Sequence, residues 1–177
     1  MADFVHLTNK TEYSLSEGAL PIARIAELCQ SFSMPAVGIS DNNNMFGALE
    51  FSEQIAKVGV QPILGCNIKI KTPKEYLHEN IEDNDLYFYL NIFSKNNEGY
   101  ENLLKCVSNA YTFNKGNAYV TVEDLIKFKD GLIILSGGNN SILTHSTGHM
   151  ITKQSQQFIS DFKKEFNDNF YIEIQRF

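Results

Sequence analysis

The sequence predicts an α/β protein built on a largely parallel sheet. Short apolar runs alternate along the chain with longer segments that have the spacing of amphipathic helices, and this alternation is typical of β-α-β units. The apolar runs are nearly continuous, as in strands that are buried on both faces. With 177 residues, of which 43% are hydrophobic, the chain is long enough to bury a substantial core.

Six strands are expected where the apolar runs are short and rich in β-branched or aromatic residues. They are residues 4–7, 36–40, 63–70, 86–94, 131–136 and 170–175. In parallel α/β proteins the functional groups gather on the loops that leave the carboxyl ends of the strands. We therefore expect the site on the loops that begin near Leu7, Asp41 and Cys66.

Five helices are expected between these strands, at residues 21–29, 44–58, 97–111, 121–128 and 152–166. The first has a clear apolar stripe, formed by Ile22, Ile25, Ala26 and Cys29. In the second, an apolar stripe is predicted at Phe46, Leu49 and Ile55-Ala56. Thr121 followed by Asp124 is the pattern of a helix cap.

Charge and cysteine content limit the function classes. The formal charge of -6 argues against a broad basic face for nucleic acid, so any DNA contact must be local or made elsewhere. Cys29, Cys66 and Cys106 are odd in number and lie among apolar neighbours, which predicts reduced core thiols in the cytoplasm. The N-terminus lacks the pattern of a signal peptide, and no apolar run approaches the roughly 18 residues of a membrane span. We expect a soluble protein that is not exported.

Several stretches together carry a family resemblance. They are residues 6–19 (HLTNKTEYSLSEGA), 40–51 (SDNNNMFGALEF), 61–66 (QPILGC), 96–104 (NNEGYENLL), 131–137 (GLIILSG) and 170–176 (FYIEIQR). In this order they strongly resemble the N-terminal region of bacterial replicative DNA polymerase III α subunits, the polymerase and histidinol phosphatase (PHP) domain. The resemblance implies a distorted seven-stranded β/α barrel, here truncated to about six strands. It also implies a single domain over residues 1–177 that is incomplete at its C-terminal end, with an open edge available for pairing.

The same resemblance implies that the metal site is degenerate. Working members of the family hold two or three metal ions for phosphoester hydrolysis, on histidine and carboxylate ligands. The matching positions here are Thr8, Lys10, Asp41, Asn42, Asn67 and Phe177. Only Asp41 keeps a strong ligand, and Lys10 would repel a divalent ion. We therefore expect no metal and no catalytic residue, and we predict that Lys10 forms an ion pair with Asp41.

Two function classes follow. In the first, the segment is the scaffold of a DNA-directed DNA polymerase, a nucleotidyltransferase of the cytoplasm that acts in DNA replication. The resemblance implies that it docks the proofreading exonuclease subunit and other polymerase III holoenzyme subunits. It also implies that DNA and Mg²⁺ bind to other domains of the parent, and that this segment needs no cofactor, membrane or activity of its own.

The second class is a residual metal-dependent phosphoesterase, acting as a proofreading nuclease or pyrophosphatase. It would have to recruit ligands from His6, Asp41, Glu12 or residues downstream of this chain. His6 is either a structural histidine or part of the cleft that this phosphoesterase would use. A third function class is a free-standing regulatory module. His145 and His149 have the spacing of a zinc pair, but the residues between them predict a polar loop.

Overall fold

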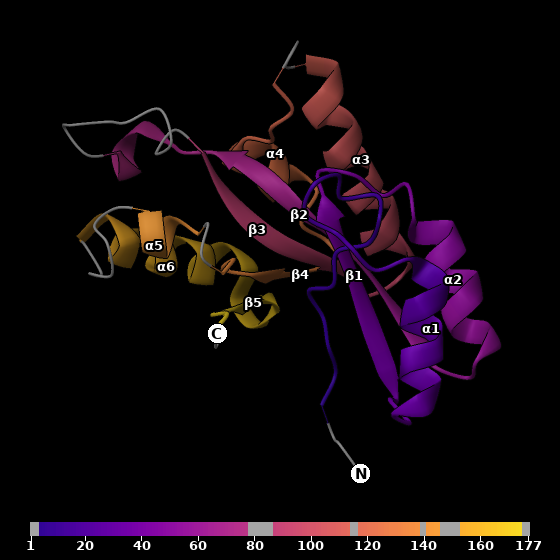
Figure 1. Cartoon of the computed structure of the whole chain (residues 1–177). Helices are drawn as coiled ribbons and strands as arrows, with labels where there is room; N and C mark the ends of the chain where they lie inside the picture. The colour runs from indigo at the N-terminus through magenta and orange to yellow at the C-terminus, as the bar shows by residue number, and fades with distance from the viewer. Residues whose placement is uncertain (1–3, 78–86, 114–116, 139–140, 146–152, 175–177) are drawn as a thin grey trace. The chain divides into compact units, whose positions relative to one another are not determined.

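A computed structural model of the chain describes residues 4–77, 87–113, 117–138, 141–145 and 153–174 (Figure 1). The chain divides into two compact units, Met1–Asn67 and Ile68–Phe177. Five strands follow one another in the sheet in chain order, β1-β2-β3-β4-β5. Strand β2 (Gln61–Lys71) begins in the first unit and ends in the second.

The first unit is built on a parallel strand pair covered by two helices. Strand β1 (Ala36–Asn42) pairs in parallel with β2, in a register that runs from Ala36 opposite Gln61 to Asn42 opposite Asn67. Helices α1 (Ile22–Ser31) and α2 (Ala48–Lys57) lie side by side (Figure 1). Their apolar stripes meet the side chains of β1 in one core.

Helix α1 confirms the stripe that its spacing predicts. Ile22, Ile25, Ala26 and Cys29 are all buried. At its start, the backbone N–H of Ile22 donates to the Glu12 carboxylate (3.1 Å to Oε2). A negative charge at this end of a helix satisfies a free donor and interacts favourably with the helix dipole.

Helix α2 begins later than predicted, and its buried face differs from the predicted one. The prediction placed Phe46 and Leu49 on the apolar stripe, but they are 74% and 72% exposed. The helix begins at Ala48, and its buried side chains are Ala48, Phe51 and Ile55, at i, i+3 and i+7. Leu49 follows Ala48 directly and so lies about 100° round the helix from this face. The stripe prediction was therefore wrong at Phe46, which precedes the helix, and at Leu49 and Ala56, which are exposed, and right at Ile55.

The strand predicted at residues 4–7 is not formed, so five strands are described instead of about six. The segment still runs along β1, where Gly38 N donates to His6 O (2.7 Å) and Ser40 N donates to Asn9 O (2.8 Å). However, the Gly38 carbonyl accepts from the Asn9 side-chain amide (2.9 Å). A side chain thus takes an acceptor that a regular ladder would offer to a backbone N–H.

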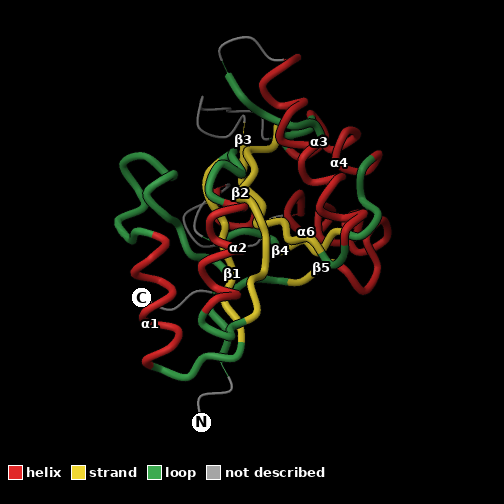
Figure 2. The backbone as a smooth tube through the Cα atoms, turned by 90° about the vertical axis from the view of Figure 1, so that its right-hand side faces the viewer, coloured by secondary structure: helices red, strands yellow, loops and turns green. Residues whose placement is uncertain are grey.

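The second unit departs from the predicted parallel arrangement. Strand β3 (Tyr87–Ser94) pairs with β4 (Leu132–Leu135) in antiparallel fashion, and β4 pairs in parallel with β5 (Phe170–Tyr171), beside it in Figure 2. Strand β4 begins beside the last residue of β3, so that Ser94 pairs with Leu132.

A close backbone approach makes this return possible. Gly131 has a φ of 73°, a left-handed conformation that glycine adopts without strain. Its carbonyl accepts from Lys95 N (2.8 Å) and would lie 1.9 Å from a Cβ at position 99. Gly99 and Gly131 together therefore allow the start of β4 to reach the end of β3.

The predicted helices of the second unit are confirmed as α3 (Asn97–Phe113), α4 (Val122–Lys127) and α6 (Lys153–Phe166). At α4, Asp124 N donates to the Thr121 hydroxyl (3.1 Å), as the cap pattern predicts. The short α5 (Ile142–His145) and the 3₁₀ turns η1 (Lys74–Tyr76) and η3 (Asn167–Asn169) were not predicted.

An aromatic cluster around Phe158 forms part of the core of the second unit. The Phe158 side chain is fully buried, and its ring centroid lies 4.1 Å from that of Phe162 and 5.2 Å from that of Phe88. Tyr76 and Phe170 pack edge-on at 5.6 and 6.4 Å. These contacts join η1, β3, β5 and α6 around a single side chain.

The three cysteines are buried and form no disulfide within the described residues, as the sequence predicts for core thiols. Burial raises the pKa of the Cys106 thiol to about 12. In the part of the chain that the structure describes, no helix is long and apolar enough to cross a membrane.

Candidate functional site at the carboxyl end of β1

Asp41 is the centre of the candidate site, near the end of β1. Its side chain is buried, with 1% exposure, and it accepts three hydrogen bonds from the loop that precedes α1. Thr11 donates its backbone N–H to Oδ1 and its hydroxyl to Oδ2, both at 2.7 Å. Ser14 donates its hydroxyl to Oδ1 at 2.6 Å. Both carboxylate oxygens are therefore satisfied by protein donors.

The local fold of the loop brings these donors together. Ser14 N donates to Thr11 O (2.9 Å), which closes a tight turn and places the two hydroxyls near each other. Gly18 N then donates to Ser14 O (2.8 Å). A Cβ at Gly18 would lie 1.7 Å from the Thr11 carbonyl oxygen, so only glycine allows the loop to close this tightly.

Lys10 pairs with Glu17 and not with Asp41, so the predicted Lys10–Asp41 pair was wrong. Burial explains the difference. Asp41 already has three donors, and an ammonium group would have to lose its water to reach it, whereas the Lys10 and Glu17 side chains are 30% and 54% exposed. An exposed pair avoids that cost and contributes little to stability.

The hydrogen bond from Lys10, followed by one from Asn42, lowers the pKa of the Glu17 carboxyl. A lowered folded-state pKa means that this interaction stabilises the fold above the unfolded-state pKa. The contribution is lost as the pH falls through the lowered folded-state value. Because the group is largely exposed, the effect is small.

The structure places five of the six predicted ligand positions in the first unit. Asn42 stands opposite Asn67 in the β1–β2 register, and Asn43 N donates to the Asn67 carbonyl (2.8 Å). The Asn42 N–H donates to the Ser14 hydroxyl (3.1 Å), while its Oδ1 is buried with no hydrogen-bond partner among the described residues. Thr8 is exposed, and Phe177 lies outside the described residues.

These residues do not fit the metal cluster that the family resemblance implies. The carboxylate of Asp41 accepts hydrogen bonds from hydroxyl and amide donors, and Lys10 brings a positive charge to a position that the resemblance matches to a ligand. The Asn42 oxygen is a neutral and weaker ligand than the carboxylates that hold Mg²⁺ or Mn²⁺. Within the described ranges, no group of three His, Cys, Asp or Glu side chains could hold an ion.

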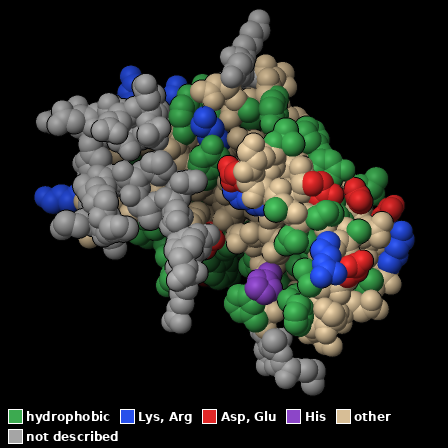
Figure 3. Space-filling view, in the orientation of Figure 1, with side chains coloured by type: hydrophobic (Ala, Val, Ile, Leu, Met, Phe, Trp, Pro, Cys, Tyr) green, Lys and Arg blue, Asp and Glu red, His purple; other side chains and the backbone are tan. Residues whose placement is uncertain are grey.

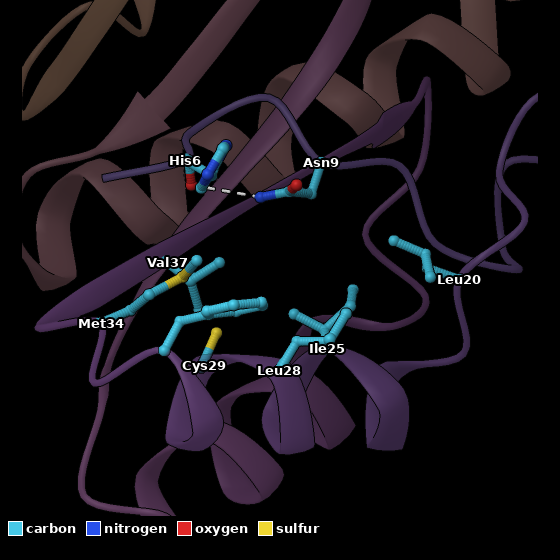
Figure 4. A pocket seen from close by; sticks show the side chains of 9 residues that line it. His6, Asn9, Leu20, Ile25, Leu28, Cys29, Met34 and Val37 are labelled. Carbon is cyan, nitrogen blue, oxygen red and sulfur yellow. Dashed lines mark hydrogen bonds between the residues drawn. The ribbon is translucent and has the colours of Figure 1, made fainter. Parts of the chain in front are cut away.

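His6 lines a separate apolar pocket of about 230 Å³. Figure 4 shows His6 and Asn9 on one wall and Ile25, Leu28 and Cys29 of α1 on the other. The imidazole packs edge-on against Phe4, with 4.8 Å between centroids. Glu12, which was also considered as a metal ligand, instead accepts a hydrogen bond from Ile22 N at the start of α1. His145 ends α5, and His149 lies outside the described residues.

Thr11, Ser14 and Glu17 are the site residues that the sequence pattern did not indicate. A search for metal ligands misses Thr11 and Ser14, because hydroxyl groups are weak ligands. The available signal was the spacing of Thr11 and Ser14 immediately after the first apolar run, where a loop faces the carboxyl ends of the strands.

The fold and the site together define an α/β protein with a buried, hydrogen-bonded carboxylate near the carboxyl end of a parallel strand. A solved structure from Bifidobacterium adolescentis, provisionally named a metal-dependent phosphoesterase, has a TM-score of 0.61 and covers 98% of this chain and 77% of its own. An amidohydrolase from Chromobacterium violaceum has a TM-score of 0.58 and covers 95% and 75%. Both are 10% identical to this chain, so the likeness concerns the fold alone.

The PHP domain profile matches residues 6–177, and the chain therefore belongs to the PHP domain family. It is 34% identical over 176 residues to the DNA polymerase III subunit alpha of Rickettsia felis and 29% identical over 178 residues to that of Haemophilus influenzae. Each alignment covers 98% of this chain but only 14% of the relative. The chain corresponds to the PHP region of these subunits, which confirms the predicted family and barrel-type fold class.

Proposed function

We propose that the chain is the PHP domain of a replicative DNA polymerase III α subunit and serves DNA replication as a scaffold without chemistry of its own. One observation carries the proposal. The Asp41 carboxylate, which the family resemblance matches to a metal ligand, accepts hydrogen bonds from Thr11 and Ser14. It therefore holds a loop in place instead of an ion. A residual phosphoesterase has less support, because its candidate ligands His6 and Glu12 make other contacts.

The role of the parent protein forms the second part of the proposal. The relatives are DNA polymerase III α subunits, which supports a DNA-directed DNA polymerase of the cytoplasm that uses Mg²⁺ in other domains. On the face shown in Figure 3, the blue Lys and Arg side chains are scattered and do not form a broad basic area. This distribution supports contact with DNA through other domains. Its partners are then the proofreading exonuclease and other holoenzyme subunits.

Metal analysis tests the absence of chemistry. We expect the chain, purified without chelators, to contain no stoichiometric Mn, Zn or Fe by elemental analysis, because Asp41 alone cannot hold a metal cluster. The matched control is Asp41→Asn, measured in parallel. An ion bound at one per chain and lost in Asp41→Asn would contradict the proposal.

A pull-down tests the docking role. An intact α subunit that contains this domain is expected to retain the purified exonuclease subunit, whereas the same subunit without residues 1–177 should lose it. Polymerase activity of the shortened subunit on primed DNA shows that its other domains remain folded. Equal retention of the exonuclease by both proteins, or by neither, would refute the docking role.

A further inference from the structure

A groove in the second unit combines an apolar floor with an acidic rim. It has a volume of about 300 Å³ and lies between η1, α4 and α6. Its floor is formed by Val122, Ile126, Phe162 and Phe166. Its charged lining consists of Glu75, Glu123, Asp161, Glu165 and Lys164, so four carboxylates face one ammonium group.

Two of these carboxylates are available for a partner. Glu75 and Glu123 are exposed, and the described part of the chain provides neither with an ion pair. Glu165 is exposed but pairs with Lys129 (3.2 Å). The rim of the groove therefore carries negative charge that the described residues do not neutralise.

Asp161 is held in a fixed position at the wall of the groove. Its Oδ2 accepts from the Tyr76 hydroxyl (2.7 Å), and Gln157 donates to Oδ1 (2.9 Å). The hydrogen bond from Tyr76, followed by that from Gln157, lowers the pKa of Asp161, so the group stays charged. An oriented carboxylate beside an aromatic ring loses little entropy when it receives a cation.

We propose that this groove binds a basic amphipathic segment of a partner protein. The apolar side chains of the segment would pack on the half-buried Val122 and Ile126, and its arginine or lysine groups would pair with Glu75, Glu123 and Asp161. Arginine suits this site because its stem packs on apolar surface while its guanidinium group binds a carboxylate through two hydrogen bonds. Charge complementarity commits the groove to a cationic protein segment and argues against nucleic acid.

A groove for a basic segment deepens the proposed scaffold role. It rests on that proposed function in one respect only, namely that a protein partner exists. Its test uses a synthetic probe, so failure here and failure of the exonuclease pull-down are separate results. The probe is a labelled amphipathic helix about 15 residues long, enough to form a helix in solution. It carries leucine on one face with arginine along both borders, and a control peptide has glutamate in place of arginine.

Binding to the 177-residue chain is measured by fluorescence anisotropy, and the contact surface is mapped by NMR chemical-shift changes. We expect the arginine probe to bind, with shifts confined to η1, α4 and α6, and the glutamate peptide not to bind. The double variant Glu75→Gln/Glu123→Gln should weaken the affinity about tenfold, because the rim then loses two of the charges that would pair with the probe.

The matched control is Glu53→Gln/Glu101→Gln, which removes the same charge from exposed positions on α2 and α3. We expect this variant to bind the arginine probe with nearly unchanged affinity. Equal losses in both double variants would show attraction to the net charge only and would overturn the proposal. The absence of binding, or chemical shifts outside the groove, would also overturn it.

Discussion

Asp41→Ala should lower the free energy of unfolding by about 3–5 kcal/mol, the range for removing one partner from a buried charged network. The substitution leaves Thr11 N and the hydroxyls of Thr11 and Ser14 without their acceptor. Urea unfolding followed by far-UV circular dichroism measures the change, because the chain has no tryptophan to report by fluorescence.

Two further variants serve as controls for Asp41→Ala. Asp168→Ala removes a carboxylate that is fully exposed, and surface changes of this kind usually stay within about 0.5 kcal/mol. Asp41→Asn keeps the shape but replaces one acceptor by a donor, so an intermediate loss is expected. A loss for Asp41→Ala no larger than that for Asp168→Ala would mean that Asp41 does not hold the loop.

Phe158→Ala is the second substitution with a large expected effect, about 3–5 kcal/mol for a buried phenylalanine. The ring is fully buried and contacts four other aromatic rings, so its removal leaves a cavity that four separate elements line. The same urea unfolding experiment gives the free-energy change.

Phe46→Ala is the matched control, because its side chain is 74% exposed and should cost no more than about 0.5 kcal/mol. Phe158→Leu fills part of the cavity and should fall between the two. If Phe158→Ala unfolded at the same urea concentration as Phe46→Ala, the aromatic cluster would not be a major part of the core.

Local patterns predicted the elements whose formation depends on neighbours in the sequence. The stripe of α1 and the Thr121 cap of α4 are visible as spacings of three or four residues, and both are present. The same reasoning failed at Phe46 and Leu49, because Phe46 precedes α2 and Leu49 lies outside the face that Ala48, Phe51 and Ile55 form. It also failed at residues 4–7, where the Asn9 side chain interrupts the ladder.

For the site, the sequence alone determined the family, because family membership depends on which residue stands at each position. The tertiary structure decided which groups surround the Asp41 carboxylate. The donors Thr11 and Ser14 lie about thirty positions from Asp41 in the chain, and only the folding of their loop onto β1 brings them within 2.7 Å. Burial of Asp41 then favoured these hydroxyl and amide donors over Lys10, since an ammonium group loses more on leaving water.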